Sequence, residues 1–374
     1  MAIERTVPSG SDPTGASRSS ASGTEPPERQ RLRRVTRADV ARAAGTSTAV
    51  VSYVLNDGPR PVAAETRRRV LEAIAATGYR PDGIARALAS GASRTLGLVV
   101  PDLSNPFFSA LGHALEEAAT RAGLVFLLGD SAEDVTRQSD LIQSFVGRRV
   151  DGLVVIGVDE EIDLSSANAA EVPVVLLDRT VAGPDISTVG IDNRSAARAA
   201  TEHLIGHDRE RIALLSGPRA VATADARAKG WEDALLAAGL PTSTDLVHRT
   251  GFDRRSGYGA GRELFQSSEG VDAVFVASEQ QAIGMLRAAH EASIRVPSDI
   301  AVVAFDGTEA SEFCVPSLTT IAQPFGELAA HALDLVRAPR GRARSVECEY
   351  QLIRRESCGC TADQCAQIQW EDER

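Results

Sequence analysis

Two short sequence patterns contain residue types that can bind a metal ion or undergo redox chemistry, at spacings that would allow them to act together. His203 and His207 are four residues apart, which is the spacing of a metal-binding pair on one helix face. The string CGCTADQC (358–365) carries three thiols, which could bind a soft metal ion or form a redox pair. No HExxH motif accompanies the histidines. We therefore expect no metal or cofactor to be bound, and we expect the cysteines to lie in a free, exposed tail.

Motifs of common enzymes are also missing. The string GYGAG (257–261) superficially resembles a nucleotide-binding loop, but it falls within a predicted helix and follows no strand. The chain has neither a Walker motif nor a G-x-S-x-G elbow. No pair of acid and base residues stands out at the end of a strand. The sequence therefore predicts a protein that is not an enzyme.

The net charge of −11 is divided unevenly along the chain. Residues 31–94 contain 12 Arg and 5 Asp or Glu, whereas residues 95–374 contain 25 Lys or Arg and 42 Asp or Glu. A basic module on an acidic body is typical of nucleic-acid binding, because cationic side chains release counterions from phosphates. The chain has no run of 18 apolar residues and no apolar leader. We therefore expect a cytoplasmic protein that contacts no membrane.

The basic segment reads as three short helices. Thr36 and Asp39 form a capping box that begins a helix ending near Gly45, and Ser47 can cap a second helix through Asn56. A third helix, from about residue 63 to residue 78, has one face formed by Val70, Leu71 and Ile74. Two helices joined by a tight turn and closed by a third predict a helix-turn-helix.

From Thr95 onward, aliphatic strand-like runs alternate with amphipathic helical stretches. They form two series of about four strands each, at residues 96–100, 124–128, 151–156 and 172–178, and at 211–217, 246–251, 273–278 and 300–306. This alternation is typical of parallel sheets covered on both faces. The predicted fold is an all-α helix-turn-helix head plus an α/β core of two doubly wound parallel-sheet lobes. Ligands of such folds bind beyond the carboxyl ends of the strands.

The chain resembles the lactose/galactose repressor (LacI/GalR) family. The resemblance rests on three strings, DVARAAG…VSYVLN, ETRRRVLEAIAATGYRP and IARALASG, and continues through residue 357. It implies a transcriptional regulator, usually a repressor, that binds pseudo-palindromic operator DNA as a homodimer under control of a small-molecule effector. A small helical bundle without DNA affinity is the alternative for the head.

The resemblance also implies which head residues read DNA. Thr48, Ala49 and Tyr53 would face base edges in the major groove, although relatives usually have arginine at the position of Tyr53. Relatives usually have serine at Ala63, where alanine forgoes a helix cap. In the hinge, Leu88 would wedge into the minor groove with Ala85 packed beside it. An ordinary buried leucine is the alternative for Leu88.

In the core, the resemblance extends to periplasmic sugar-binding proteins. It implies that Asn105 bonds a hydroxyl and that Phe107 and Phe108 sandwich a sugar ring, with packing under the helix as the alternative for one ring. Ser278-Glu279 stands where relatives usually have Asn-Asp, so the ligand's identity cannot be transferred. The full set of predicted effector-binding residues is Asn105, Phe107, Phe108, Asp178, Arg179, Arg227, Ser278, Asp306 and Gln323.

These observations predict a division of the chain into a disordered tail (1–30), a head (35–80), a hinge (81–93), a core (95–357) and a flexible tail (358–374). The core divides into an N-lobe of about 95–207 and 323–346 and a C-lobe of about 208–322 and 347–357. An exported solute receptor and a sugar-acting enzyme are the other function classes, which a gel shift with DNA would separate from a regulator. The C-terminus has no leucine heptads, so a dimer is expected rather than a tetramer.

Overall fold

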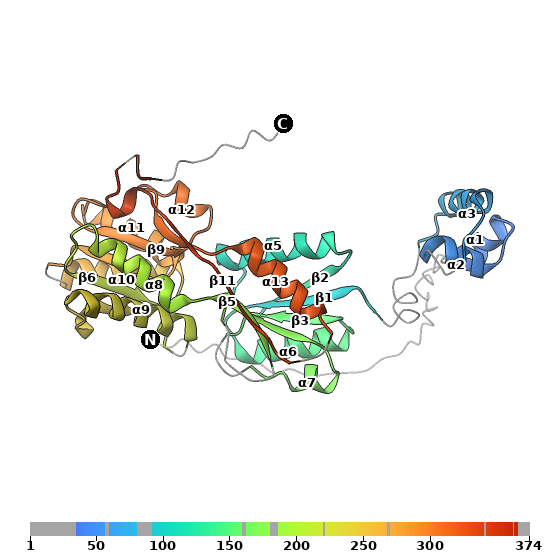
Figure 1. Cartoon of the computed structure of the whole chain (residues 1–374), viewed down its shortest axis with the longest axis horizontal. Helices are drawn as coiled ribbons and strands as arrows, with labels where there is room; N and C mark the ends of the chain where they lie inside the picture. The colour runs from blue at the N-terminus through green and yellow to red at the C-terminus, as the bar shows by residue number, and fades with distance from the viewer. Residues whose placement is uncertain are drawn as a thin grey trace, which may run out of the picture. The chain divides into compact units, whose positions relative to one another are not determined.

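The computed structural model describes residues 35–56, 60–80, 92–158, 162–179, 186–219, 221–267, 270–339, 342–361 and 363–365. The chain divides into two compact units, with the boundary between residues 82 and 83 (Figure 1). The predicted N-terminal tail and the hinge residues Ala85 and Leu88 lie outside the described residues. No helix in the described ranges is long and apolar enough to cross a membrane.

The head contains the three predicted helices, α1 (Arg37–Ala43), α2 (Thr48–Asn56) and α3 (Ala64–Thr77). The capping box is confirmed, because the Asp39 carboxylate accepts from the Thr36 amide at 2.9 Å and the Thr36 hydroxyl accepts from the Asp39 amide. Fully buried valines from all three helices form the core, and Ala63 provides no side-chain cap. Leu71 is 51% exposed, so its predicted place on the apolar face of α3 is wrong. It lies about 100° around the helix from buried Val70.

The first lobe of the core is a parallel six-stranded sheet, ordered β11-β5-β4-β3-β1-β2. Helices α5 and α13 pack together in one hydrophobic cluster, while α6 packs with α7 in a second cluster over the other face. The strands are β1 (Thr95–Val100), β2 (Val125–Asp130), β3 (Gly152–Val155), β4 (Val174–Leu177), β5 (Ser187–Ile191) and β11 (Ser345–Cys348). The helices are α5 (Pro106–Arg121), α6 (Val135–Gly147), α7 (Ser165–Ala169) and α13 (Phe325–Arg337).

The second lobe repeats this plan with the order β12-β10-β9-β8-β6-β7, in which only β12 runs antiparallel to its neighbour. Its strands are β6 (Ile212–Ser216), β7 (Val247–Arg249), β8 (Ala273–Val276), β9 (Ala301–Asp306), β10 (Thr319–Ala322) and β12 (Gln351–Ile353). Its helices are α8 (Asn193–Ile205), α9 (Ala222–Ala238), α10 (Arg254–Ser267), α11 (Glu279–Glu291) and α12 (Ala310–Phe313), with short 3-10 turns η1 (Thr244–Leu246) and η2 (Glu356–Cys358). The predicted fold class and all eight predicted strands are confirmed; β5, β10, β11 and β12 were not predicted.

Three segments connect the lobes, after β5, after β10 and after β11 (Figure 1). Helix α8 packs against α9, β8, β9 and β10, all in the second lobe. The chain therefore crosses near residue 192, and the predicted lobe boundary at residue 207 is too late. The pattern of apolar residues marks which face of α8 is buried, but it does not say which sheet covers that face.

The C-terminal boundary also differs from the prediction. Cys358 is fully buried and packs in the main core cluster, so the core continues beyond residue 357. Ser357 accepts from the Thr319 amide at 2.9 Å and donates to the Val302 carbonyl at 2.7 Å, which joins this segment to β10 and β9. Cys358 and Cys360 thus pack against the second lobe rather than lying in a free tail.

Candidate functional site

The predicted DNA-reading residues share one face of α2. Thr48 and Ala49 are exposed at the start of the helix, and Tyr53 is half-buried one turn later. Val51 and Val54 point the other way, into the head's core. The opposite face of α2 is thus packed in the core of the head, and the three predicted residues lie on the face that remains available for contact.

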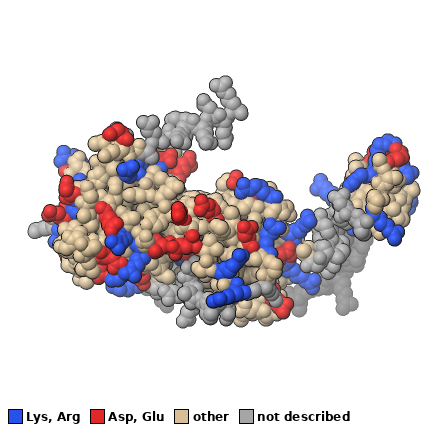
Figure 2. Space-filling model, in the orientation of Figure 1, with Lys and Arg blue, Asp and Glu red and all other residues tan. Residues whose placement is uncertain are grey.

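The surface of the head is predominantly basic. Five arginines are exposed and two of them pair with acidic neighbours, Arg42 with Asp39 and Arg68 with Glu65 and Glu72. Figure 2 shows basic side chains around much of the visible face of the head. The exposed arginines are Arg42, Arg60, Arg68, Arg69 and Arg80. Such a surface favours phosphate contacts whatever the net charge of the whole chain.

A cavity lies between the two lobes, and we call it the interlobe cavity. Its lining is Asn105, Phe107, Phe108, Asp178, Arg179, Thr223, Arg227, Phe252, Ser278 and Asp306. Eight of the nine predicted effector residues are in this list; the ninth, Gln323, contacts Asp306 from the second crossing segment. Thr223 and Phe252 were not predicted. The volume of the cavity is only about 20 Å³, so the lining side chains nearly close it.

Aromatic rings enter the cavity from both lobes. Phe107 and Phe108, on the first turn of α5, contact each other edge to face with centroids 5.2 Å apart, so no sugar ring fits between them. The implied sandwich by this pair is therefore wrong. Phe252 faces them from the second lobe, and the Arg179 guanidinium carbon lies 5.5 Å from the Phe108 centroid and 5.9 Å from that of Phe252. The planar guanidinium of Arg179 thus lies between Phe108 of the first lobe and Phe252 of the second lobe.

Phe252 was missed although the sequence carried a signal for it. It follows the predicted strand 246–251, where ligand-binding residues of this fold are expected, and aromatic residues make up only 4% of the chain. Its ring packs so closely on Gly217 that a Cβ atom there would lie 2.0 Å from the ring. Glycine at this position is what admits the ring.

Arg179 and Asp178 follow the end of β4. The Arg179 guanidinium binds both carboxylate oxygens of Glu133 at 3.1 Å, and this pair is fixed within the first lobe. Asp178 is buried, and its Oδ1 atom has no hydrogen-bond partner among the described groups. Burial raises the pKa of Asp178 to about 6, against an ordinary value of 3.8. A buried carboxylate oxygen without a donor is suited to bind a ligand hydroxyl.

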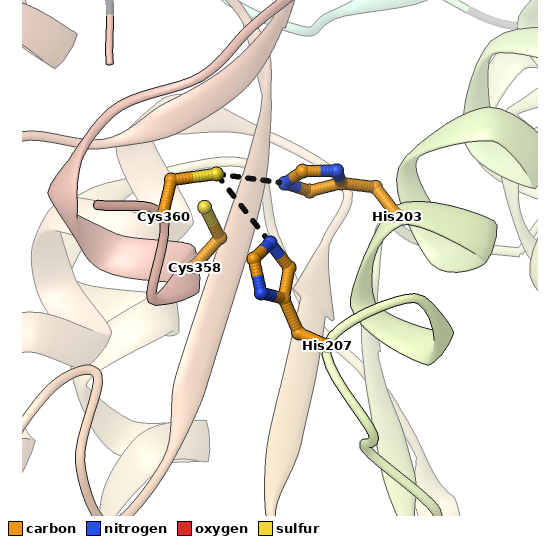
Figure 3. A group of neighbouring side chains, drawn as sticks. All are labelled: His203, His207, Cys358 and Cys360. Carbon is orange, nitrogen blue, oxygen red and sulfur yellow. Dashed lines mark hydrogen bonds between the residues drawn. The ribbon is translucent and has the colours of Figure 1, made fainter. Parts of the chain in front are cut away.

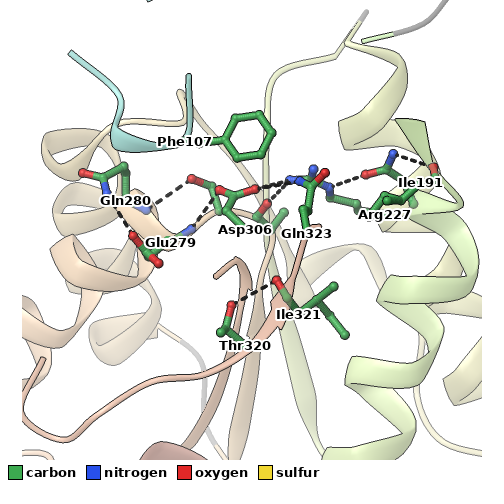
Figure 4. Close-up of polar contacts among 12 residues, drawn as sticks. Phe107, Ile191, Arg227, Glu279, Gln280, Asp306, Thr320, Ile321 and Gln323 are labelled. Atoms are coloured by element: carbon green, nitrogen blue, oxygen red, sulfur yellow. Dashed lines mark hydrogen bonds and ion pairs between the residues drawn. The ribbon is translucent and has the colours of Figure 1, made fainter. Parts of the chain in front are cut away.

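On the opposite side, Arg227 of α9 and Asp306 at the end of β9 form a buried ion pair at 3.5 Å (Figure 4). Arg227 also donates to the Asn193 side chain at 2.8 Å and to the Ala277 carbonyl at 2.5 Å. Its guanidinium carbon lies 3.7 Å from the centroid of the Phe305 ring. This packing fixes the guanidinium before any ligand arrives.

The backbone is held in an uncommon conformation beside both carboxylates. Asp178 has a φ of +61° and Asp306 a φ of +95°, in the region that side chains other than glycine seldom adopt. Burial raises the pKa of Asp306 above its ordinary range, while Arg227 opposes that rise. Strained backbone and perturbed carboxyl groups at the ends of two parallel strands are typical of a binding site.

The Ser278-Glu279 pair divides its roles. Ser278 caps α11 and lines the cavity, whereas the Glu279 carboxylate turns away from the lining and accepts from the Thr308 amide at 2.8 Å. The Thr308 and Ser311 hydroxyls also donate to it. On the other lobe, Asn105 caps α5 by accepting from the Phe107 amide at 3.0 Å. Glu279 therefore has a structural role through these hydrogen bonds, and only Ser278 of this pair reaches the cavity.

Two family models match this chain. Residues 36–82 match the model described as bacterial regulatory proteins, lacI family, and residues 93–353 match periplasmic binding proteins and sugar binding domain of LacI family. The chain belongs to the LacI family. This LacI-family chain is 34% identical over 305 residues to catabolite control protein A of Priestia megaterium, a match that covers 81% of this chain and 91% of that protein.

Solved structures agree with this assignment. The lac repressor dimer bound to operator and an anti-inducer superposes with a TM-score of 0.77 at 28% identity, covering 89% of this chain and all of that one. The complex of the transcriptional regulator CelR with cellobiose gives a TM-score of 0.66 at 30% identity, covering 87% of this chain and all of that one. This LacI-family chain is therefore a DNA-binding transcriptional regulator with a small-molecule-binding core.

Proposed function

We propose that this regulator is a homodimeric repressor whose operator affinity is controlled by a neutral sugar in the interlobe cavity. The observation that carries the proposal is the composition of the cavity. Phe108 and Phe252 line the cavity from the two lobes with Arg179 beside both rings, and charged side chains of both signs complete the lining. Aromatic faces suit the apolar side of a sugar ring, and charged groups suit its hydroxyls.

The charges of the lining favour a neutral ligand. Asp178 and Asp306 are offset by Arg179 and Arg227, and Arg179 is further paired with Glu133. A phosphate or carboxylate would enter a site without surplus positive charge and would meet two buried carboxyl groups. The cellobiose complex of CelR supports a sugar as the class of ligand.

The switch follows from the position of the cavity. A ligand that binds one arrangement of the lobes better than another shifts their equilibrium by its difference in affinity. The two hinges of a dimer would then be brought together or kept apart, with Ala85 and Leu88 contacting the minor groove and Thr48, Ala49 and Tyr53 reading the major groove. The resemblance of these residues to the family supports this part of the proposal.

Calorimetric titration tests the ligand. A panel of neutral mono- and disaccharides is compared with the corresponding sugar phosphates, using the wild type and Arg227→Ala. We expect binding by a neutral sugar, no binding by its phosphate, and loss of binding in the variant. Tight binding of the phosphate alone would contradict the assignment of a neutral ligand, and equal binding by the variant would contradict the assigned cavity.

A gel shift tests the DNA function. The probe is the DNA upstream of the regulator's own gene, with and without the sugar found by titration. Leu88→Ala in the hinge is expected to weaken binding at least tenfold, whereas Leu71→Ala, which removes an exposed leucine of the head, should leave it unchanged. Wild-type affinity of the Leu88 variant would refute the hinge wedge, and no shift at low salt would refute the function.

A further inference from the structure

The two metal-binding patterns of the sequence meet in space, although more than 150 residues separate them. His203 lies in the last turn of α8, and His207 follows just after that helix. Their Nε2 atoms lie 3.8 Å and 3.4 Å from the Sγ atom of Cys360 (Figure 3). The ligand atoms of both histidines, Cys358 and Cys360 all lie within 4.8 Å of one another, and we call these four residues the His–Cys cluster.

The fold accounts for this meeting. Helix α8 and the turn η2 both pack on strands β9 and β10, which places the end of the helix beside residues 358–360. Gly359 separates the two cysteines with a φ of +95°, a conformation that glycine adopts without cost. This turn lets both sulfur atoms face the helix (Figure 3).

We propose that one zinc ion binds to the two imidazoles and two thiolates of the His–Cys cluster. Zinc in structural sites is tetrahedral, with Zn–S bonds of about 2.3 Å and Zn–N bonds of about 2.0–2.1 Å. Those bonds place neighbouring ligand atoms about 3.3–3.8 Å apart. The two Cys360–histidine distances already fall in that range. Four protein ligands leave no open position, so the site is structural and not catalytic.

The surroundings of the cluster fit the same assignment. Cys358 is fully buried, whereas Cys360 and both histidines are half-buried, so an ion can enter from solvent. The Thr319 hydroxyl lies 3.0 Å from the Cys358 sulfur and is placed to donate to a thiolate, as outer partners of metal ligands do. Two thiolates also balance the charge of a divalent ion. The bound ion would join the C-terminal segment to α8, whose first residue Asn193 holds Arg227 of the interlobe cavity.

Metal analysis of the full chain tests the proposal. The protein is prepared without a histidine tag and under reducing conditions, and its zinc is measured per chain. Cobalt replacing zinc should give the intense absorption of a tetrahedral cobalt–thiolate site. We expect one ion per chain in the wild type and an affinity lower by at least about 100-fold in Cys360→Ser and His207→Ala, a larger loss than for an outer partner.

Cys314→Ser is the matched control, because Cys314 is also half-buried but lies outside the cluster. It should retain one ion per chain. If a variant fails to fold, the cobalt spectrum of the wild type still decides whether thiolates bind the ion. Two results would overturn the proposal: no stoichiometric ion and no cobalt–thiolate band in the wild type, or unchanged affinity in both cluster variants.

Discussion

Replacing Arg227 by alanine isolates the buried ion pair of the interlobe cavity. Arg227 is 4% exposed, and loss of its side chain removes the pair with Asp306, the hydrogen bonds to Asn193 and the Ala277 carbonyl, and the stacking on Phe305. Removing one partner of a buried pair typically costs about 3–5 kcal/mol. Asp306 retains contacts to the Glu279 amide at 3.3 Å and to Gln323 at 3.4 Å, so we expect the lower end, about 3 kcal/mol.

Urea unfolding of the full chain measures this cost in the transition of the core. Arg198→Ala is the control, because Arg198 pairs with Glu202 at 2.7 Å while both side chains are about half exposed. An exposed pair of this kind contributes only about 0.3–0.5 kcal/mol. The double variant Arg227→Ala/Asp306→Asn should recover part of the loss, since it no longer leaves a buried carboxylate without its cation. A loss no greater than that of the control would refute the reasoning.

Three further predictions concern the head and the cavity. Ala63→Ser supplies the missing cap of α3 and should stabilise the head by about 1 kcal/mol, seen as a higher melting temperature of its calorimetric transition; an unchanged temperature would contradict this. Because burial raises the pKa of Asp178 to about 6, the stability due to this carboxyl is complete below pH 4 and is lost as the pH rises through 6. Asp178→Asn should therefore be more stable than the wild type at pH 7, by up to about 3 kcal/mol in urea unfolding, and not at pH 3; equal curves at both pH values would contradict this. Phe252→Ala should weaken sugar binding by up to about tenfold in titration calorimetry, whereas Phe313→Ala, 58% exposed and outside the cavity, should not; equal losses would refute the assigned ring contact.

Local patterns predicted the fold class and the head helices, whereas the resemblance to the LacI family predicted most of the cavity. The capping box at Thr36 and the aliphatic runs of the central strands act within a few residues, so a single sequence displays them. Strand β5 reads STVGI, whose short polar run becomes a strand only by pairing with β4 and with β11, which follows it by more than 150 residues. No local pattern encodes that pairing.

The errors in the site have the same origin. Phe107 and Phe108 are adjacent, and their edge-to-face contact depends on how α5 packs, which the residue types do not reveal. Glu279 was not a predicted site residue, and its contacts to Thr308 and Ser311, about 30 residues further along the chain, are likewise set by packing. The two halves of the His–Cys cluster were visible as separate spacings. Only the packing of α8 and η2 on the same two strands joins them.

The nearly closed interlobe cavity has a consequence for the dose at which the regulated genes respond. A ligand cavity ordinarily needs several hundred Å³, whereas this one has a volume of only about 20 Å³, so the lobes or the lining side chains must move apart before the proposed sugar enters. The apparent dissociation constant is then the intrinsic one divided by the fraction of molecules that are open. If about 1% are open, the apparent affinity is about 100-fold weaker than the contacts alone would give. Substitutions in the three crossing segments can therefore reset the metabolite concentration that triggers the response without altering any residue that contacts the metabolite.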